Sequence, residues 1–217
     1  MNSTANLVEL CDIGVRMGRT PVLRGLDLTI EPGEVVGIRG ANGSGKTTLL
    51  RLVATLLRPS EGTGRVLGAG LTDPARYEIR RQVALIGHVP ALYDELTLEE
   101  NTKFVARFCG AGAERIAEVL DVVGLTEART RRVRECSAGM QRRAEFARVL
   151  LGNPKIVLFD EAHSGLDASA TPLVEHVIKS VVAADGAAMV VSHQEDRTAP
   201  FTDRVLELDQ GRLWEAA

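Results

Sequence analysis

Residues 40–47 read Gly40-Ala41-Asn42-Gly43-Ser44-Gly45-Lys46-Thr47, which matches G-x-x-x-x-G-K-[ST], the loop that cradles phosphates in nucleotide-binding proteins. Its glycines let successive backbone N–H groups turn inward toward an anion, where a Cβ would obstruct them. Lys46 then brings a compact charge to the β- and γ-phosphates, and the Thr47 hydroxyl is placed to bind Mg²⁺. The stretch predicts an ATP site made of Gly40, Asn42, Gly43, Ser44, Gly45, Lys46, Thr47 and Thr48.

The segments on either side of this loop support the prediction. Residues 35–38 form a short apolar run, as expected of a buried parallel strand. After the loop, apolar residues recur at helical spacing, so the loop is expected at a helix N-terminus, where the helix dipole favours phosphate. These apolar residues are Leu49, Leu50, Val53, Leu56 and Leu57. The alternative is a glycine-rich turn that matches the motif by chance.

Composition restricts the class of protein. The 217 residues suffice for one core, or for a core with an inserted lobe. A net charge of -3, with 25% charged residues, gives no bias toward polyanions, so no nucleic-acid partner is expected. The three cysteines, Cys11, Cys109 and Cys136, lie at no metal-ligand spacing, which predicts reduced thiols in the cytosol. Neither a signal peptide nor a membrane span is predicted.

Strand and helix patterns alternate along the chain. Residues 7–10 and 26–31 read as strands, and the apolar–polar alternation of the second favours a half-exposed antiparallel piece. Five further short segments are predicted as strands: 65–68, 83–86, 156–159, 189–191 and 205–208. Three helical runs are predicted between them, at 98–108, 115–123 and 140–151. The order predicts a core at about 1–87 and 154–217, with a helical lobe inserted at about 88–153.

A second part of the nucleotide site is predicted where residues 156–159 end in Asp160 and Glu161. A buried strand would deliver both carboxylates to the edge of the sheet where α/β proteins bind ligands. Asp160 would hold Mg²⁺ through its water shell, and Glu161 would orient and polarise the attacking water. The alternative is an acidic strand end that simply faces solvent.

Two weaker candidates complete the site. His193 follows the apolar strand at 189–191, on the same sheet edge as Asp160, and is interpreted as a sensor of the γ-phosphate; by itself, a single histidine is more often structural. Ser137, Ala138 and Gly139 stand at the start of a predicted helix, where small residues form a second anion-binding nest. An ordinary N-cap is the alternative for them.

Together and in this order, these segments resemble the ATP-binding-cassette (ABC) ATPases. The matching motifs are the phosphate loop at 40–48, a signature at Ser137-Ala138-Gly139-Met140 with Arg143, Walker B at Asp160-Glu161, a D-loop at Ser164-Gly165-Leu166-Asp167 and a switch histidine at His193. The resemblance implies one α/β domain over 1–217, with a P-loop NTPase (RecA-like) core, an antiparallel β subdomain and an inserted helical subdomain. It also implies Mg²⁺-dependent ATP hydrolysis in a head-to-tail dimer, in which Ser137 and Gly139 of one subunit close over the γ-phosphate held by the other.

Three features depart from the family pattern. Met17 stands where an aromatic residue usually stacks on adenine, and its thioether is expected to cover the base with less specific geometry. Cys136 and Ala138 replace a leucine and a glycine of the signature, and both are small enough to keep the nest. His88 occupies the place of the usual glutamine, where it would hydrogen-bond a water or reach the Mg²⁺ shell.

These observations favour the ATPase subunit of a transporter, at the cytoplasmic face of a membrane. The expected partners are a separate transmembrane permease, docked near residues 86–108, and a second ATPase subunit, as a homodimer. An exporter is favoured, because residues 85–90 and 95–101 are similar to the ATPase subunit of the cytochrome c maturation haem exporter. The alternatives are a soluble cassette ATPase of translation or DNA maintenance, which usually carries coiled-coil insertions or basic extensions, and a small-molecule kinase.

Overall fold

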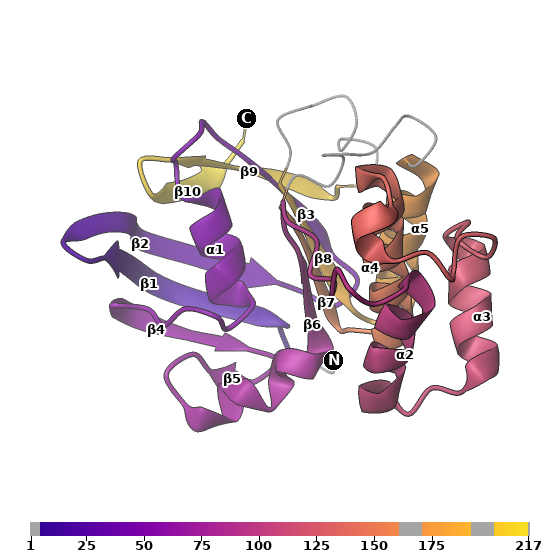
Figure 1. Cartoon of the computed structure of the whole chain (residues 1–217). Coiled ribbons are helices and arrows are strands. Elements are labelled where there is room, and N and C mark those ends of the chain that lie inside the picture. The colour runs from indigo at the N-terminus through magenta and orange to yellow at the C-terminus, as the bar shows by residue number, and fades with distance from the viewer. Residues whose placement is uncertain (1–4, 161–170, 192–201, 217) are drawn as a thin grey trace.

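A six-stranded sheet runs through the middle of the molecule, between an antiparallel sheet on one side and a group of helices on the other (Figure 1). The computed structural model describes residues 5–160, 171–191 and 202–216. In the order β10-β9-β3-β8-β7-β6, all neighbouring strands are parallel except β9 and β10. The strands are β3 (Val35–Arg39), β6 (Val83–Ile86), β7 (Ile156–Asp160), β8 (Ala187–Val191), β9 (Arg204–Asp209) and β10 (Arg212–Glu215). The parallel arrangement brings the carboxyl ends of β3, β7 and β8 to one edge.

Both faces of this sheet are buried, as the continuous apolar runs predict. In β7, Val157 and Phe159 belong to the core that contains the helices α4 and α5, whereas Ile156 and Leu158 belong to the core that contains α1. Successive side chains of a strand point to opposite faces, so one apolar run serves two cores. The three helices are α1 (Lys46–Val53), α4 (Ala138–Gly152) and α5 (Thr171–Val182).

The second sheet is antiparallel, as predicted, in the order β2-β1-β4-β5. Its strands are β1 (Val8–Met17), β2 (Thr20–Ile30), β4 (Glu61–Val66) and β5 (Ala69–Gly70). α1 lies between this sheet and the central one, and its Leu49, Leu50 and Leu52 are fully buried there (Figure 1). The apolar face of the antiparallel sheet therefore packs around the helix that begins at the phosphate loop.

The predicted helical runs are present as α2 (Leu98–Cys109), α3 (Ala113–Val122) and α4, which lie together on the far side of the central sheet (Figure 1). Buried apolar residues of all three helices form one cluster with α5 and with one face of the central sheet. Within the described ranges there are also three short 3₁₀ helices: η1 (Pro74–Tyr77), η2 (Ile79–Gln82) and η3 (Val133–Glu135). The lobe boundaries near 88 and 153 stay a prediction.

The helix after the phosphate loop is shorter than predicted, and its expected continuation to Leu57 is wrong. α1 ends at Val53, and Thr55 has a φ of 59°, a left-handed conformation that interrupts the helix. Leu56 is consequently turned outward, with 51% of it exposed. The Arg80 guanidinium donates to the carbonyl of Thr55 at 2.8 Å. A side chain from η2 thus satisfies a carbonyl group that a longer helix would have bonded itself.

Two other predicted features need correction. The strand expected at 65–68 is β4, which ends at Val66, while Leu67 and Gly68 form the turn to β5 with φ values of 49° and 77°. The helix α5 and the strand β10 were not predicted from the sequence. A signal for α5 was present in apolar residues at helical spacing, namely Leu173, Val174, Val177, Ile178 and Val181, all buried.

One buried amide holds the turn ahead of α2. Asn101, 3% exposed, accepts a hydrogen bond from the Tyr93 N–H at 2.8 Å. It also donates to the carbonyls of Tyr93 and Thr97, at 3.1 and 3.0 Å. Thr97 then begins α2 with a capping box that it shares with Glu100. The Asn101 side chain therefore adds three hydrogen bonds to a turn that is also held by backbone bonds such as Leu96 N–H to the Tyr93 carbonyl.

Replacing Asn101 by Ala is expected to lower the free energy of unfolding by about 2 kcal/mol, because it removes three hydrogen bonds and takes the acceptor away from the Tyr93 N–H. Urea denaturation followed by circular dichroism measures the loss. Arg107→Ala, at an exposed position of the same helix, is the control, with an expected change within about 0.5 kcal/mol. A loss for Asn101→Ala no larger than the control's would contradict the structural role of the amide.

Candidate functional site

The phosphate loop lies between β3 and α1, wedged between two other strands. Gly40 has a φ of 146°, and a Cβ there would lie 2.1 Å from the Leu208 carbonyl oxygen of β9. Gly45 has a φ of 113°, and a Cβ there would lie 2.9 Å from Leu23 Cδ2 of β2. A Cβ at position 40 would require β9 to move, and at position 45 it would press on the Leu23 side chain in a left-handed conformation that favours glycine. The motif glycines thus fix the loop against both sheets.

Lys46 is folded back over the loop. It is 7% exposed, and its Nζ donates to the carbonyl oxygens of Gly40 and Ala41 at 2.7 and 2.8 Å. The Ser44 hydroxyl beside it is buried and has no hydrogen-bond partner among the described residues. A buried polar group of this kind is normally satisfied by protein, water or ligand. A phosphate oxygen in the loop fits both the ammonium charge and the Ser44 hydroxyl.

Two oxygen-bearing side chains meet next to Lys46. Thr47 Oγ1, in the first turn of α1, donates to Oδ2 of Asp160 at 2.7 Å. Asp160 is the last residue of β7 and is 5% exposed. A hydroxyl and a carboxylate oxygen are the hard donors that Mg²⁺ prefers, and Mg²⁺ usually keeps several waters beside them. These two residues, 113 apart in sequence, are therefore placed to share one metal ion.

A cavity of about 210 Å³ joins these features. This volume is below the roughly 300–1,000 Å³ of pockets that enclose a whole small-molecule ligand, which fits a site for the phosphates of a nucleotide. His88, exposed on the segment that follows β6, borders the same cavity. The lining residues are Asn42, Gly43, Gly45, Lys46, Thr47, Thr48, His88 and Asp160. The structure thus brings His88 beside both predicted metal ligands.

The predicted signature lies apart from this cavity, at the N-terminus of α4. The Ser137 hydroxyl accepts a hydrogen bond from the Met140 N–H at 3.3 Å, as an ordinary N-cap does. Ser137 and Ala138 are exposed and Gly139 is half-buried. Gln141 steadies the preceding turn by donating to the carbonyls of Val133 and Cys136. The helix end is open to solvent, while its role as an anion-binding nest stays a prediction.

The remaining predicted residues lie either outside the lining of the cavity or outside the described part of the chain. Met17, at the end of β1, is 44% exposed and lies outside the lining of the cavity, so its contact with adenine stays a prediction. Glu161, the D-loop at 164–167 and His193 lie outside the described residues. The strands that lead to Glu161 and His193 are neighbours, because Asp160 pairs with Val191 in the parallel register of β7 and β8.

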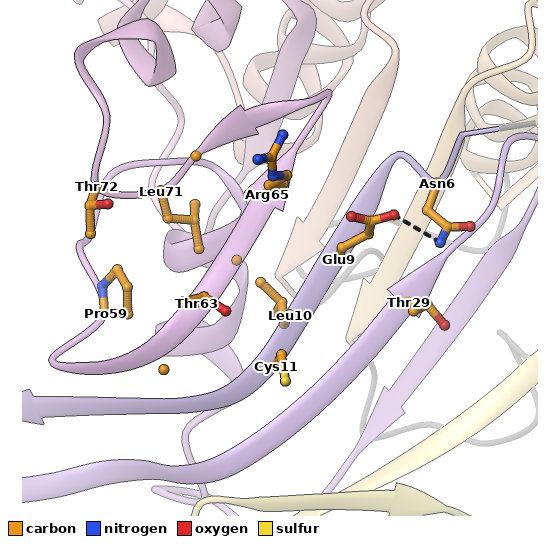
Figure 2. A pocket seen from close by; sticks show the side chains of 13 residues that line it. Asn6, Glu9, Leu10, Cys11, Thr29, Pro59, Thr63, Arg65, Leu71 and Thr72 are labelled. Atoms are coloured by element: carbon orange, nitrogen blue, oxygen red, sulfur yellow. Dashed lines mark hydrogen bonds between the residues drawn. The ribbon is translucent and has the colours of Figure 1, made fainter.

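A larger hollow, about 450 Å³, lies on the antiparallel sheet (Figure 2). Glu9 lines it, and its carboxylate accepts a hydrogen bond from Asn6 at 3.1 Å. Arg65 and Cys11 lie on the strands around it. No residue of the phosphate loop contributes to its lining. The smaller cavity is therefore the candidate functional site.

One buried ion pair near the cavity was missed by the sequence analysis. Arg142 Nη1 lies 2.9 Å from Oε2 of Glu145 on α4, and both side chains are 4% exposed. Burial raises the pKa of Glu145, although hydrogen bonds from the Ala91 N–H and from Arg142 oppose the shift. The sequence signal was a pair of opposite charges three residues apart in a predicted helical run, a spacing that places them on one helix face.

Comparison with known proteins decides the family. The sequence profile of the family described as "ABC transporter" matches residues 23–164, well over half of the chain. The chain belongs to the ABC transporter family. The matched segment includes the phosphate loop, the signature and Asp160, and the ABC fold confirms the α/β architecture expected from the sequence.

Relatives of similar sequence belong to different ABC transporters. DrrA, the daunorubicin/doxorubicin resistance ATP-binding protein of Streptomyces peucetius, is 34% identical over 198 residues, which cover 89% of this chain and 60% of DrrA. MetN, the methionine import ATP-binding protein of Mesorhizobium japonicum, is 33% identical over 223 residues, which cover 99% of this chain and 61% of MetN. The chain thus spans about three fifths of the length of these relatives.

Solved ABC structures share the whole architecture. The ATP-binding subunit of an ABC transporter superposes with a TM-score of 0.87 at 26% identity, covering 96% of this chain and 90% of that one. An ATP-binding cassette solved as a dimer in a post-hydrolysis state with ADP and phosphate gives a TM-score of 0.84 at 27% identity, covering 96% and 98%. The chain thus shares the architecture of these ABC ATP-binding proteins. In the ranges that the structure describes, no helix is long and apolar enough to cross a membrane.

Proposed function

We propose that this chain is the subunit of an ABC transporter that binds and hydrolyses ATP with Mg²⁺ and drives a separate transmembrane subunit. The observation that carries the proposal is the contact of Thr47 with Asp160 beside Lys46, which joins metal-type ligands to a phosphate-binding loop in one cavity. A small-molecule kinase would also need a site for its acceptor, and phosphate transfer to a metabolite instead of water would favour that alternative.

The residues of the site divide the work of hydrolysis. Loop N–H groups and Lys46 bind and orient the phosphates. Thr47 and Asp160 would hold the metal ion, which would supply neutralising charge to the phosphates when bound. Glu161 orients a water for in-line attack on the γ-phosphorus, and His193 contacts the γ-phosphate. The new bond to water forms as the bond to the β-phosphate oxygen breaks, giving ADP and phosphate. The chemistry is positioning and charge stabilisation with no covalent intermediate.

A head-to-tail homodimer completes each site in this proposal. The N-terminus of α4 is exposed at Ser137 and Ala138, which is consistent with contact to a nucleotide on a second subunit. Backbone N–H groups and the helix dipole at such an end favour phosphate. The similar cassette was solved as a dimer bound to ADP and phosphate, which supports dimerisation of the present chain.

The transmembrane subunit is proposed to dock on exposed aromatic residues of the helical lobe. Tyr93, Phe104 and Phe108 are 55%, 39% and 75% exposed, and both ring pairs, Tyr93–Phe104 and Phe104–Phe108, have centroids 5.2 Å apart in edge-to-face geometry. All three residues of this aromatic cluster lie within the predicted docking segment, residues 86–108. An exposed group of large apolar rings is typical of a surface that a partner covers.

Phe108→Glu is expected to weaken assembly with the transmembrane subunit by at least 2 kcal/mol, because it places a charge in the apolar contact, while ATP binding by the isolated chain is retained. Co-purification from gently solubilised membranes and ATP binding by the purified chain are the two measurements. Val122→Glu, on the exposed side of α3, is the matched control and should assemble normally. Equal loss in both variants, or in neither, would refute this docking surface.

The transporter is proposed to be an exporter, with support from the resistance protein DrrA; the similar importer MetN makes direction the point to test. The relatives described above do not single out haem export. Mass spectrometry of what co-purifies with the tagged chain is the direct test. A stoichiometric polytopic protein, whose sequence identifies the transporter type, is the expected result. Recovery with ribosomes or DNA in the soluble fraction would keep the ATPase assignment and refute transport at the cytoplasmic membrane face.

A further inference from the structure

Three charged side chains on α4 reach across to the segment that carries His88. Arg142 Nη1 donates to the Gly87 carbonyl oxygen at 2.7 Å. Oε1 of Glu145 accepts from the Ala91 N–H at 2.9 Å, and Arg148 donates to the Ala91 carbonyl oxygen. We call Arg142, Glu145 and Arg148 the α4 clamp. The clamp binds residues 87–91 at both ends.

The clamp is an unusual device for stability alone. Removing charges from water is costly, and a buried ion pair is often no more stabilising than a well-packed apolar pair of similar size. The charged side chains add geometric specificity. Each of their hydrogen bonds has a preferred distance and angle, and these can be met by only a narrow range of positions of the 87–91 backbone. The segment itself offers little packing to fix that placement, since Val89 is 82% exposed and His88 is exposed.

The segment held in this way borders the nucleotide site. His88 lies between the two bound residues and lines the cavity together with Thr47 and Asp160. A chain of five residues with both ends fixed leaves little freedom to the residue next to one end. The position of His88 relative to Thr47 and Asp160 is therefore restrained by α4, whose N-cap is the signature residue Ser137.

We propose that Arg142 and Glu145 are positioning residues for His88: they hold the 87–91 segment so that His88 stays beside Thr47 and Asp160, and they tie its place to the position of α4. The inference rests on the proposed function, ATP hydrolysis at this cavity. In the dimer, α4 would close on the nucleotide bound by the second subunit. Through Arg142 and Glu145, the same movement of α4 would shift His88 beside the nucleotide bound by its own subunit.

A double-mutant cycle separates positioning from a general structural role. Glu145→Gln is expected to raise the Mg²⁺ concentration for half-maximal ATPase activity about 10-fold, a usual size for loss of a group that supports a metal site from outside. In the His88→Ala background the same substitution should change that concentration less than about twofold, because its effect acts through His88. Glu118→Gln, in the exposed pair with Arg115, is the control and should have no effect in either background.

A readout without nucleotide tests the clamp directly. The chain has four histidines, and the NMR signal of the His88 ring can be assigned from its absence in His88→Ala. In the nucleotide-free protein this signal should shift or broaden in Glu145→Gln and stay unchanged in Glu118→Gln. Equal effects of Glu145→Gln on Mg²⁺ dependence in both backgrounds, together with an unmoved His88 signal, would overturn the proposal.

The test must also distinguish a misfolded variant and a chain without ATPase activity from failure of the clamp itself. If Glu145→Gln fails to fold, the double variant Arg142→Met/Glu145→Met removes both buried charges and leaves neither unpaired, and it must still displace the His88 signal. If the unaltered chain fails to bind or hydrolyse ATP, the proposed function is wrong, whereas the NMR comparison continues to test the clamp. If the unaltered chain hydrolyses ATP normally but the His88 NMR signal is unmoved in both Glu145→Gln and Arg142→Met/Glu145→Met, the proposed role of the clamp is refuted and the proposed ATPase function is not.

Discussion

Replacing Glu161 by Gln is expected to abolish ATP turnover while preserving ATP-dependent dimerisation. The amide keeps the size of the side chain but is a far weaker acceptor for the proton of the attacking water. Loss of such a group lowers rates about 10²- to 10⁴-fold. The groups proposed to bind the phosphates and the metal, Lys46 with Thr47 and Asp160, remain in place. Nucleotide should therefore still be bound, and the closed dimer should accumulate because hydrolysis no longer separates it.

Phosphate release and size-exclusion chromatography, each with and without Mg²⁺·ATP, give the two measurements. Glu127→Gln changes an exposed carboxylate of the same type and should hydrolyse ATP normally and dimerise only transiently. Near-normal hydrolysis by Glu161→Gln would remove Glu161 from this role. Loss of both hydrolysis and dimerisation would indicate instead that Glu161 contributes to nucleotide binding.

The sequence predicted the components of the site because each motif is tied to a strand end. Residues 35–38 and 156–159 read as buried parallel strands, and parallel strands present their carboxyl ends at one edge. The meeting of Thr47 with Asp160 at 2.7 Å follows from that rule together with the phosphate-loop motif. The prediction did not require knowledge of how far apart the two segments lie in space, because a parallel sheet already places the ends of these strands at the same edge.

The contacts of the α4 clamp were not predictable in the same way. Arg142 and Gly87 are 55 residues apart and Glu145 and Ala91 are 54 apart, and neither pair belongs to a repeating ladder. Helical periodicity shows which face of α4 is buried, but not which backbone atoms lie opposite a charged residue on that face. The early end of α1 has a similar cause, because Arg80 comes from a separate segment to bond the Thr55 carbonyl.

Lys46→Ala is expected to weaken ATP binding about 100-fold or more, since hydrogen bonds to charged groups are worth about 1.5–3 kcal/mol each. The ammonium is buried and already placed over the loop by the carbonyls of Gly40 and Ala41. Its charge therefore needs little rearrangement to contact the phosphates. Among the described residues, Lys46 is the one lysine or arginine that lines the cavity. Turnover of ATP should fall below detection, because the Lys46 ammonium would also stabilise the negative charge that develops in the transition state of phosphoryl transfer.

Equilibrium binding of a fluorescent ATP analogue measures this loss, and Arg51→Ala provides the control. Arg51 is an exposed cation of the same helix, so its removal changes net charge equally and should leave the Kd within about twofold, as expected for a screened surface charge. The comparison separates a local contact from a general electrostatic attraction. Near-normal binding by Lys46→Ala would mean that the loop N–H groups and Ser44 bind the phosphates by themselves. In that case the two carbonyl contacts of Lys46 would be its whole function, and Lys46→Ala should lower the melting temperature instead.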